Sequence, residues 1–142
     1  MNIHEYQGKS ILESFGVSIQ RGKVADTPEA AHAAAMVLTK ETGTEWFVLK
    51  AQIHAGGRGK GVVTETGSHG VVLAKGLDEV KGKAEGILGG HLVTAQTNDQ
   101  GKQVHKILIA EDVYYPGDSE PEEYYMSVLL DRATGKNIIM YS

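Results

Sequence analysis

The spacing of hydrophobic residues predicts a helix at the start of the chain. Asn2 and Glu5 have the spacing of a capping box, so the helix would begin there and run to about Phe15. Gly16 then provides a suitable end, because glycine adopts the left-handed conformation at low cost. At helical spacing, the buried stripe would consist of Ile11, Leu12 and Phe15.

Two further helices are predicted from similar signals. The second would be capped by Thr27, carry Pro28 in its first turn and end at Gly43. Its apolar face is made of small residues, which implies close packing on a neighbour. The third helix is the most amphipathic and would end at Gly89 and Gly90. The two apolar faces comprise Ala31, Ala34, Ala35 and Leu38, and then Leu77, Val80, Ala84, Ile87 and Leu88.

Runs rich in β-branched and aromatic residues predict strands between and after these helices. A short strand is expected at 22–25 and a buried strand at 46–49. The remaining strands are expected as a hairpin with arms at 62–64 and 71–73, a pair at 91–97 and 104–110, and a hairpin with arms at 124–130 and 137–141. The predicted fold class is α+β, with mixed or largely antiparallel sheets and three packed helices in residues 1–142.

The composition is that of a soluble globular domain and excludes several classes of function, with 41% hydrophobic and 23% charged residues. No apolar stretch approaches the roughly 18 residues of a membrane span, and the first residues do not form a signal peptide. The absence of cysteine excludes disulfides and thiolate metal sites, and it is compatible with the cytoplasmic location that we expect. A net charge of -4 argues against a nucleic-acid-binding surface.

A glycine-rich loop after the buried strand carries the candidate chemistry. Lys50 follows strand 46–49 directly, and residues 56–61 read Gly-Gly-Arg-Gly-Lys-Gly. Glycines let the backbone N–H groups of such a loop approach phosphate oxygens closely. Arg58 can bind phosphate bidentately, and Lys50 and Lys60 add positive charge. These residues predict a phosphate-binding loop, while composition alone also allows a charged surface turn.

The spacing in this loop disfavours two common phosphate-binding motifs. No Ser or Thr follows Lys60 and no helix pattern follows the loop, so G-x-x-x-x-G-K-[ST] does not fit. The dinucleotide motif G-x-G-x-x-G fails as well. A flexible loop that covers a phosphate is the favoured interpretation. The six histidines lack the spacing of a zinc site, so we expect no metal to be bound by these residues.

Three segments of the chain resemble one family. Residues 48–61, Val-Leu-Lys-Ala-Gln-Ile-His-Ala-Gly-Gly-Arg-Gly-Lys-Gly, closely resemble the signature of the succinyl-CoA synthetase β subunit. The opening residues 1–9 and the tail 127–142 resemble the same subunit. The resemblance covers essentially the whole chain, and it implies the N-terminal part of an ATP-grasp nucleotide-binding domain.

The resemblance also implies a place in a larger enzyme. The family interconverts succinate and CoA with succinyl-CoA in the tricarboxylic acid cycle, coupled to ATP or GTP through a phosphohistidine on a partner α subunit. Its β subunit is much longer, so the CoA-ligase domain and the Mg²⁺ ligands would lie beyond residue 142. We therefore expect no catalytic residue in this chain and no activity from it alone. The β subunit of a malyl-CoA or citryl-CoA synthetase and a non-catalytic nucleotide-binding module are the alternatives.

Carried over residue by residue, the resemblance implies a phosphate site. Lys50 corresponds to the lysine that contacts the nucleotide phosphates. Gly57, Arg58 and Gly59 correspond to the loop that closes on them.

The same resemblance implies contacts to the base and the ribose. The adenine-side hinge falls within residues 110–113, where Glu111 and Val113 are the candidates. Glu123 corresponds to the acid that binds the ribose hydroxyls. Gln20 lies where the family's base preference is set, and glutamine there goes with guanine. We favour ATP and ADP as ligands and leave GTP and GDP open, with an exposed loop glutamine as the other interpretation.

Overall fold

The computed structural model describes residues 2–114 and 121–142, and within them three helices and nine strands. In chain order the elements are α1 (Glu5–Ser14), β1 (Gly22–Ala25), α2 (Pro28–Thr42), β2 (Trp46–Ala51), β3 (Val62–Val63), β4 (Val71–Lys75), α3 (Gly76–Glu85), β5 (His91–Val93), β6 (Lys102–Gln103), β7 (Ile107–Glu111), β8 (Met126–Asp131) and β9 (Lys136–Tyr141).

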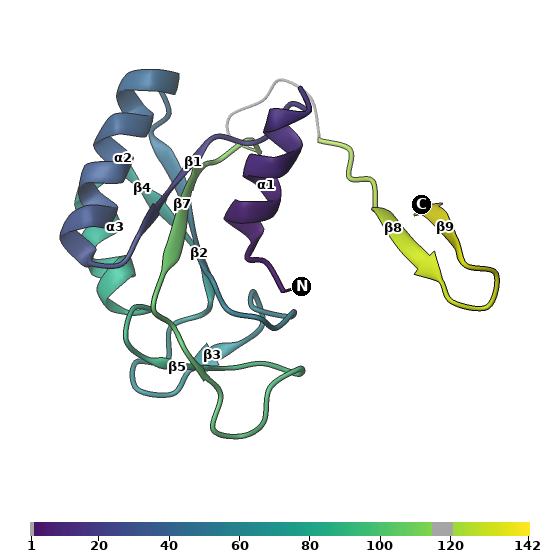
Figure 1. Cartoon of the computed structure of the whole chain (residues 1–142). Helices are drawn as coiled ribbons and strands as arrows, with labels where there is room; N and C mark the ends of the chain where they lie inside the picture. Colours follow the sequence, from purple (N-terminus) through teal and green to yellow (C-terminus); the bar gives the residue numbers. More distant parts are fainter. Residues whose placement is uncertain (1, 115–120) are drawn as a thin grey trace.

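A four-stranded sheet with the order β1-β7-β2-β4 forms the centre of the fold (Figure 1). A smaller sheet, β3-β5-β6, and the β8–β9 hairpin make up the rest of the described strands. Every pairing between these strands is antiparallel. The predicted α+β class with three packed helices is therefore confirmed.

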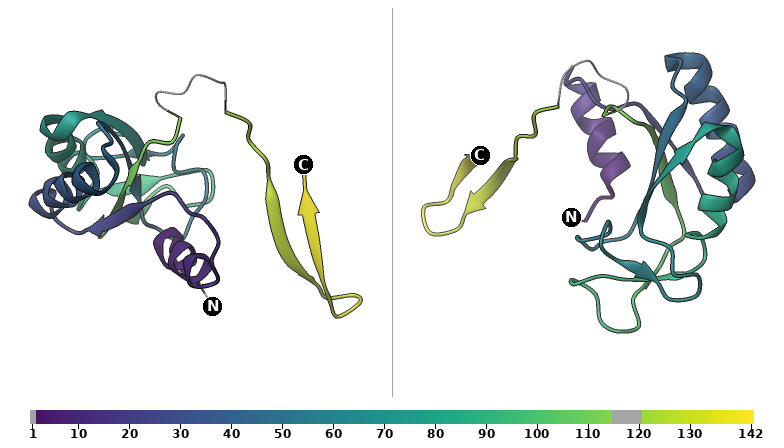
Figure 2. Two further views of the ribbon diagram at one scale, coloured as in Figure 1. Left: turned by 90° about the horizontal axis from the view of Figure 1, so that it is seen from above. Right: turned by 180° about the vertical axis from the view of Figure 1, so that it is seen from behind.

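Helices cover both faces of the central sheet. Figures 1 and 2 show α2 and α3 side by side on one face and α1 on the other. Side chains alternate between the two faces along a strand, and in β2 Phe47, Leu49 and Ala51 are fully buried in the core with α2 and α3. The intervening residues, Lys50 among them, are only half-buried and point to the side of α1. The sheet thus presents a lysine to α1 and an apolar surface to the other helices.

The second helix forms as its sequence signals predict. The Thr27 hydroxyl accepts a hydrogen bond from the backbone N–H of Ala30 at 3.1 Å, and Pro28 is the first helical residue. Gly43 ends the helix with φ at 75°. Three residues of the predicted face are fully buried and a fourth, Ala34, is half-buried, which permits close packing on α3. The fully buried three are Ala31, Ala35 and Leu38.

The first helix departs from its prediction in two respects. It begins at Glu5, and the side chain of Gln7 accepts the hydrogen bond from the His4 backbone N–H at 2.9 Å, so the predicted Asn2–Glu5 capping box is wrong. The predicted buried stripe is also wrong, because α1 meets the sheet through the polar residues of its first two turns. The stripe residues Ile11, Leu12 and Phe15 are 49%, 49% and 81% exposed.

The third helix ends earlier than predicted. Gly86, rather than the pair Gly89-Gly90, is its C-cap, so the helical residues stop at Glu85. Ile87 is nevertheless fully buried, because the turn after the helix carries it back into the core. The apolar pattern therefore does mark a buried face, part of which belongs to the turn after the helix.

The predicted hairpin over residues 62–73 is wrong. The chain does turn back there, since the backbone N–H of Val63 donates to the carbonyl of Ser68 at 2.8 Å. Beyond one isolated bridge between Val62 and His69, however, the arms separate. β3 pairs with β5, whereas β4 joins the central sheet beside β2.

The last third of the described chain is made of strands, with corrections to their bounds. β5 covers only the start of the predicted strand 91–97. β7 covers the second half of the predicted strand 104–110, and the short strand β6 lies before it. The predicted turn at residues 98–101 is present between β5 and β6, with Gly101 at φ 69°. The predicted final hairpin is confirmed as β8 and β9, paired from Met126–Tyr141 to Asp131–Lys136. In both views of Figure 2 this hairpin stands apart from the central sheet.

Candidate functional site

Lys50 lies inside β2 rather than directly after it, because the strand continues to Ala51. Its register places it opposite Leu108 of β7 on one side and Val71 of β4 on the other, so the backbone around it is fixed by two neighbours. The side chain is 22% exposed and points toward α1. The position therefore holds a cation at a defined point on the sheet surface.

The glycine-rich loop leaves the same strand and brings Arg58 back over it. Gly57 has φ at 74°, a conformation that glycine adopts readily, and its carbonyl accepts from the N–H groups of Lys60 and Gly61 at 3.1 and 3.0 Å. The Arg58 Nη1 donates to the carbonyl of Ala51 at 2.6 Å. A further hydrogen bond joins the Gly56 N–H to the side chain of Gln96 at 2.7 Å. These bonds hold the guanidinium beside the end of β2.

Lys50 and Arg58 converge on one carboxylate, that of Glu5 in the first turn of α1. Lys50 Nζ lies 3.2 Å from Glu5 Oε1, and Arg58 Nη2 lies 2.8 Å from Glu5 Oε2. Burial by itself raises the pKa of Glu5, but the hydrogen bonds and charges of Arg58 and Lys50 outweigh it and hold the pKa below its ordinary value of 4.5. Two cations from different elements are thus placed within reach of a single anionic group.

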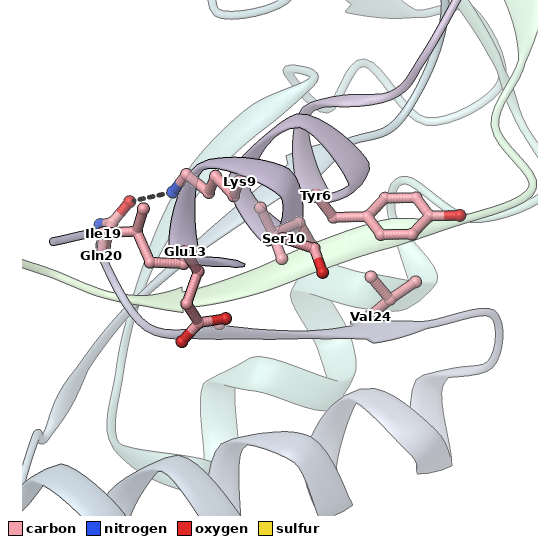
Figure 3. Close-up of a pocket in the computed structure, with 9 residues that line it drawn as sticks. Tyr6, Lys9, Ser10, Glu13, Ile19, Gln20 and Val24 are labelled. Carbon is pink, nitrogen blue, oxygen red and sulfur yellow. Dashed lines mark hydrogen bonds between the residues drawn. The ribbon is translucent and has the colours of Figure 1, made fainter. Parts of the chain in front are cut away.

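The network continues from Lys50 to Gln20 and Lys9. The Gln20 Oε1 accepts from Lys9 Nζ at 3.0 Å and from Lys50 Nζ at 3.3 Å, while its Nε2 donates to the carbonyl of Glu111. Figure 3 shows the ammonium group of Lys9 directed at the Gln20 side chain. Burial, followed by the charge of Lys50, lowers the pKa of Lys9, and Glu5 opposes that shift.

A cavity of about 220 Å³ lies beside Gln20, between α1 and the β1–β7 edge of the sheet (Figure 3). Residues of α1 form one wall, and Gln20, Gly22 and Leu108 contribute to the other. The remaining lining residues are Tyr6, Lys9, Ser10, Glu13, Ile19 and Val24. Lys9 and Gln20, which are hydrogen-bonded to each other, therefore both line this cavity.

Glu111 links the end of β7 to this network through its backbone and its side chain. Its carbonyl accepts from Gln20, and its Oε1 accepts from the backbone N–H of Arg21 at 2.9 Å. Val113 lies two residues further on and is 62% exposed. Glu123 follows the undescribed residues and accepts a hydrogen bond from the hydroxyl of Tyr114, which raises the pKa of Tyr114.

The structure therefore brings six of the eight predicted site residues into one region, and two remain outside it. Gln20, Lys50, Arg58 and Glu111 are joined by hydrogen bonds directly or through Glu5, and Gly57 shapes the loop that carries Arg58. Gly59 lies in the same loop, with open space around it. Neither Val113 nor Glu123 has a described contact with the other six.

A family model described as "ATP-grasp domain" matches residues 2–142, which is almost the whole chain. The chain belongs to the ATP-grasp domain family. The antiparallel sheets, the three helices and the glycine-rich loop after β2 agree with the fold that the sequence motifs implied.

This ATP-grasp chain is similar over its full length to curated proteins named succinate–CoA ligase (ADP-forming) subunit beta. It is 64% identical to the one from Christiangramia forsetii, 62% to that from Flavobacterium psychrophilum and 52% to that from Bacillus thuringiensis. All 142 residues are covered, but they amount to 34%, 34% and 33% of those proteins. The chain thus spans about a third of the length of the curated relatives it matches.

The described residues of the ATP-grasp chain do not supply a metal-binding group of their own. Within residues 2–114 and 121–142, no three His, Cys, Asp or Glu side chains gather so that they could hold a metal ion. His4 and His54 stack with ring centroids 4.1 Å apart instead of presenting a metal-binding pair. In that same part of the chain, no helix is long and apolar enough to cross a membrane.

Two residues of this network were missed by the sequence analysis. Glu5 was interpreted only as a helix-capping residue, and Lys9 was given no role. Both lie on α1, and Glu5 is 45 positions away from Lys50 in the sequence. No local pattern reveals that their side chains meet Lys50 and Gln20, because the packing of α1 on the sheet creates those contacts.

Proposed function

We propose that this chain binds the phosphates of ATP or ADP with Lys50 and the loop Gly57–Gly59. The observation that supports the proposal best is the convergence of Lys50 and Arg58 on one carboxylate, since a site that places two cations around one anion suits a phosphate group as well. The Gly59 position is open, so backbone N–H groups of the loop can approach a ligand. Membership of the ATP-grasp family supports the same ligand class.

The base and ribose contacts are proposed on the same basis. Glu111 and Val113 would lie beside the base, and Glu123 would bind the ribose hydroxyls. Gln20 is the candidate for base selection, because its amide can both donate and accept. The amide is held between Lys9 and the Glu111 carbonyl, so a purine would meet an oriented group. ATP and ADP are proposed as the ligands, with GTP and GDP as the alternative pair.

We further propose that the chain is the nucleotide-binding part of a succinate–CoA ligase β subunit, as the names of its relatives suggest. The whole enzyme would convert succinate and CoA to succinyl-CoA in the tricarboxylic acid cycle, in the cytoplasm, with a phosphohistidine on an α subunit. Residues 1–142 would form the N-terminal part of the ATP-grasp domain. The described residues contain no group of three His, Cys, Asp or Glu side chains that could hold Mg²⁺. We therefore assign no Mg²⁺ ligand among them and expect the ligands in the longer protein.

A nucleotide titration tests the phosphate site. Calorimetric titration of the chain with ADP, ATP, GDP and GTP should give saturable binding, and Lys50→Ala and Arg58→Ala should each weaken it about tenfold or more, as expected for hydrogen bonds to charged groups. Lys81→Ala is the matched control, because Lys81 of α3 also pairs with a glutamate, Glu29 of α2, at 2.9 Å, but on the face of the sheet opposite α1. Equal binding by the parent and both site variants would refute the proposal.

A second assay tests the expectation about catalysis. With succinate, CoA and ATP supplied together with Mg²⁺, the chain alone should produce no ADP above the rate of a reaction without protein. Succinate- and CoA-dependent ADP formation would overturn the assignment of the chemistry to the remainder of a longer protein and its partner subunit.

A further inference from the structure

Glu5 occupies the place in this site where an anionic ligand would be expected. Its two carboxylate oxygens each take one of the two cations, Lys50 at 3.2 Å and Arg58 at 2.8 Å. The side chains of all three residues are 22% exposed, so a ligand in solution can reach the cluster although most of its surface is covered by protein. A carboxylate and a phosphate present similar oxygen pairs to a guanidinium, and they therefore compete for the same donors.

We propose that Glu5 is a built-in counter-ion that holds Lys50 and Arg58 in the nucleotide-free chain and is displaced by the nucleotide phosphates. This inference rests on the proposed function, because it assumes that phosphates bind at these two side chains. Glu5 would thus set the affinity of the site. It keeps the cations in place and neutralises them, so the ion pairs with Glu5 must break before phosphate can bind, and this lowers the net affinity for phosphate. Glu5 contacts no nucleotide atom in this account and is a positioning residue.

The way in which α1 is attached to the sheet gives the displacement a structural consequence. None of the ten residues of α1, all of them described, is buried. Among the described residues, its side-chain hydrogen bonds to the sheet side, apart from those of Glu5, are the weak bond from the Tyr6 N–H to Gln52 at 3.4 Å and the bond from Lys9 to Gln20 at 3.0 Å. Loss of the Glu5 ion pairs therefore removes the strongest link of the first turn of α1. Nucleotide binding should loosen this helix.

Glu5→Gln tests the competition directly, because it removes the charge and keeps the shape and one acceptor oxygen. In a calorimetric titration of the chain, the variant should bind ADP about tenfold more tightly than the parent, which corresponds to about 1.4 kcal/mol. Adenosine, which lacks phosphates, should bind both proteins equally. Unchanged or weaker ADP binding by the variant, or an equal gain for adenosine, would overturn the inference.

Glu29→Gln is the matched control for this substitution. Glu29 also lies in the first turn of a helix and also pairs with a lysine, Lys81, at 2.9 Å, but it is on the other side of the central sheet. Glu29→Gln alters the net charge and the first turn of a helix in the same way as Glu5→Gln. Because it lies away from Lys50 and Arg58, it should leave ADP affinity within a factor of two. An equal gain in the control would mean that net charge, and not Glu5, sets the affinity.

Hydrogen exchange of the parent chain gives a second test that needs no variant. ADP should slow the exchange of amides in the loop 57–59 and accelerate that of amides in α1, whereas a ligand that left the Glu5 ion pairs intact would slow or not change α1. Slower or unchanged exchange in α1 would overturn the inference while leaving phosphate binding intact. If Lys50→Ala and Arg58→Ala bind ADP as the parent does, the proposed function itself fails, and the inference fails with it.

Discussion

Gly61 is the glycine of the loop whose replacement should cost the most stability. A Cβ at this position would lie 2.8 Å from both the Thr94 Cγ2 and the Val93 carbonyl oxygen. Val93 belongs to β5 and pairs with Val62, the residue directly after Gly61, so its backbone cannot retreat without opening the β3–β5 ladder. Gly61→Ala should therefore strain the connection between the loop and the small sheet.

The size of this effect follows from two opposed contributions. Overpacking of a tight contact costs about 1 to 3 kcal/mol. A Gly→Ala change regains about 0.4 to 1 kcal/mol, because the alanine restricts the unfolded chain. Taking the middle of each range, the free energy of unfolding should accordingly fall by about 1.3 kcal/mol. With a urea dependence of about 2 kcal/mol per molar, the unfolding midpoint would fall by about 0.5 to 1 M.

Gly59→Ala is the control within the same loop. No atom outside its chain neighbours lies within 4 Å of a Cβ at Gly59, and its φ is not in the left-handed region. Its urea midpoint, followed by circular dichroism, should equal or slightly exceed that of the parent. The reasoning is refuted if Gly61→Ala unfolds at the parent's midpoint, or if both variants lose the same stability.

Two further predictions concern the core and the acidic network. Leu49→Ala removes a fully buried side chain from the middle of the central sheet and should lower the free energy of unfolding by about 2 to 5 kcal/mol; a loss under about 1 kcal/mol in urea unfolding would contradict the assigned core. The pKa of Glu5 is lower in the folded chain than its ordinary 4.5, so its ion pairs contribute stability above about pH 4.5 that is lost as the pH falls through the folded-state pKa. Urea midpoints measured from pH 6 to pH 3 should fall less steeply in Glu5→Gln than in the parent, and parallel curves would contradict this.

The sequence was most informative where a local signal and the buried face agree. Thr27 and Gly43 mark the ends of α2 through side-chain capping and a left-handed glycine, which depend only on neighbouring residues. The apolar run at 46–49 predicts a buried strand, and β2 is an inner strand of the observed sheet with Phe47 and Leu49 fully buried. These features could be predicted because no distant residue decides them.

The errors occur where distant parts of the chain decide. The stripe of α1 has a helical period, but period alone does not say whether another element covers it, and among the described elements none buries Phe15. The residues on both sides of the turn at Val63–Ser68 have the composition of hairpin strands. However, β3 pairs with β5 and β4 pairs with β2. Pairing choices of this kind depend on the whole topology, which local patterns do not contain.

Only the part of the candidate site that lies in one local motif could be predicted from the sequence. Lys50, Arg58 and the glycines stand close together in one motif, so their shared chemistry is visible in the sequence. Glu5 reaches them only because α1 packs across the face of β2 on which Lys50 lies. The counter-ion of the two cations therefore emerged from the structure alone.

The most direct test of this account is the location of ADP on the chain. In an NMR titration of the ¹⁵N-labelled chain, ADP should shift the amide signals of Lys50 and of residues 57–59 saturably, and adenosine should shift them much less. Saturable shifts confined to other segments, or equal responses to ADP and adenosine, would contradict the claim that Lys50 and the glycine-rich loop bind the nucleotide phosphates.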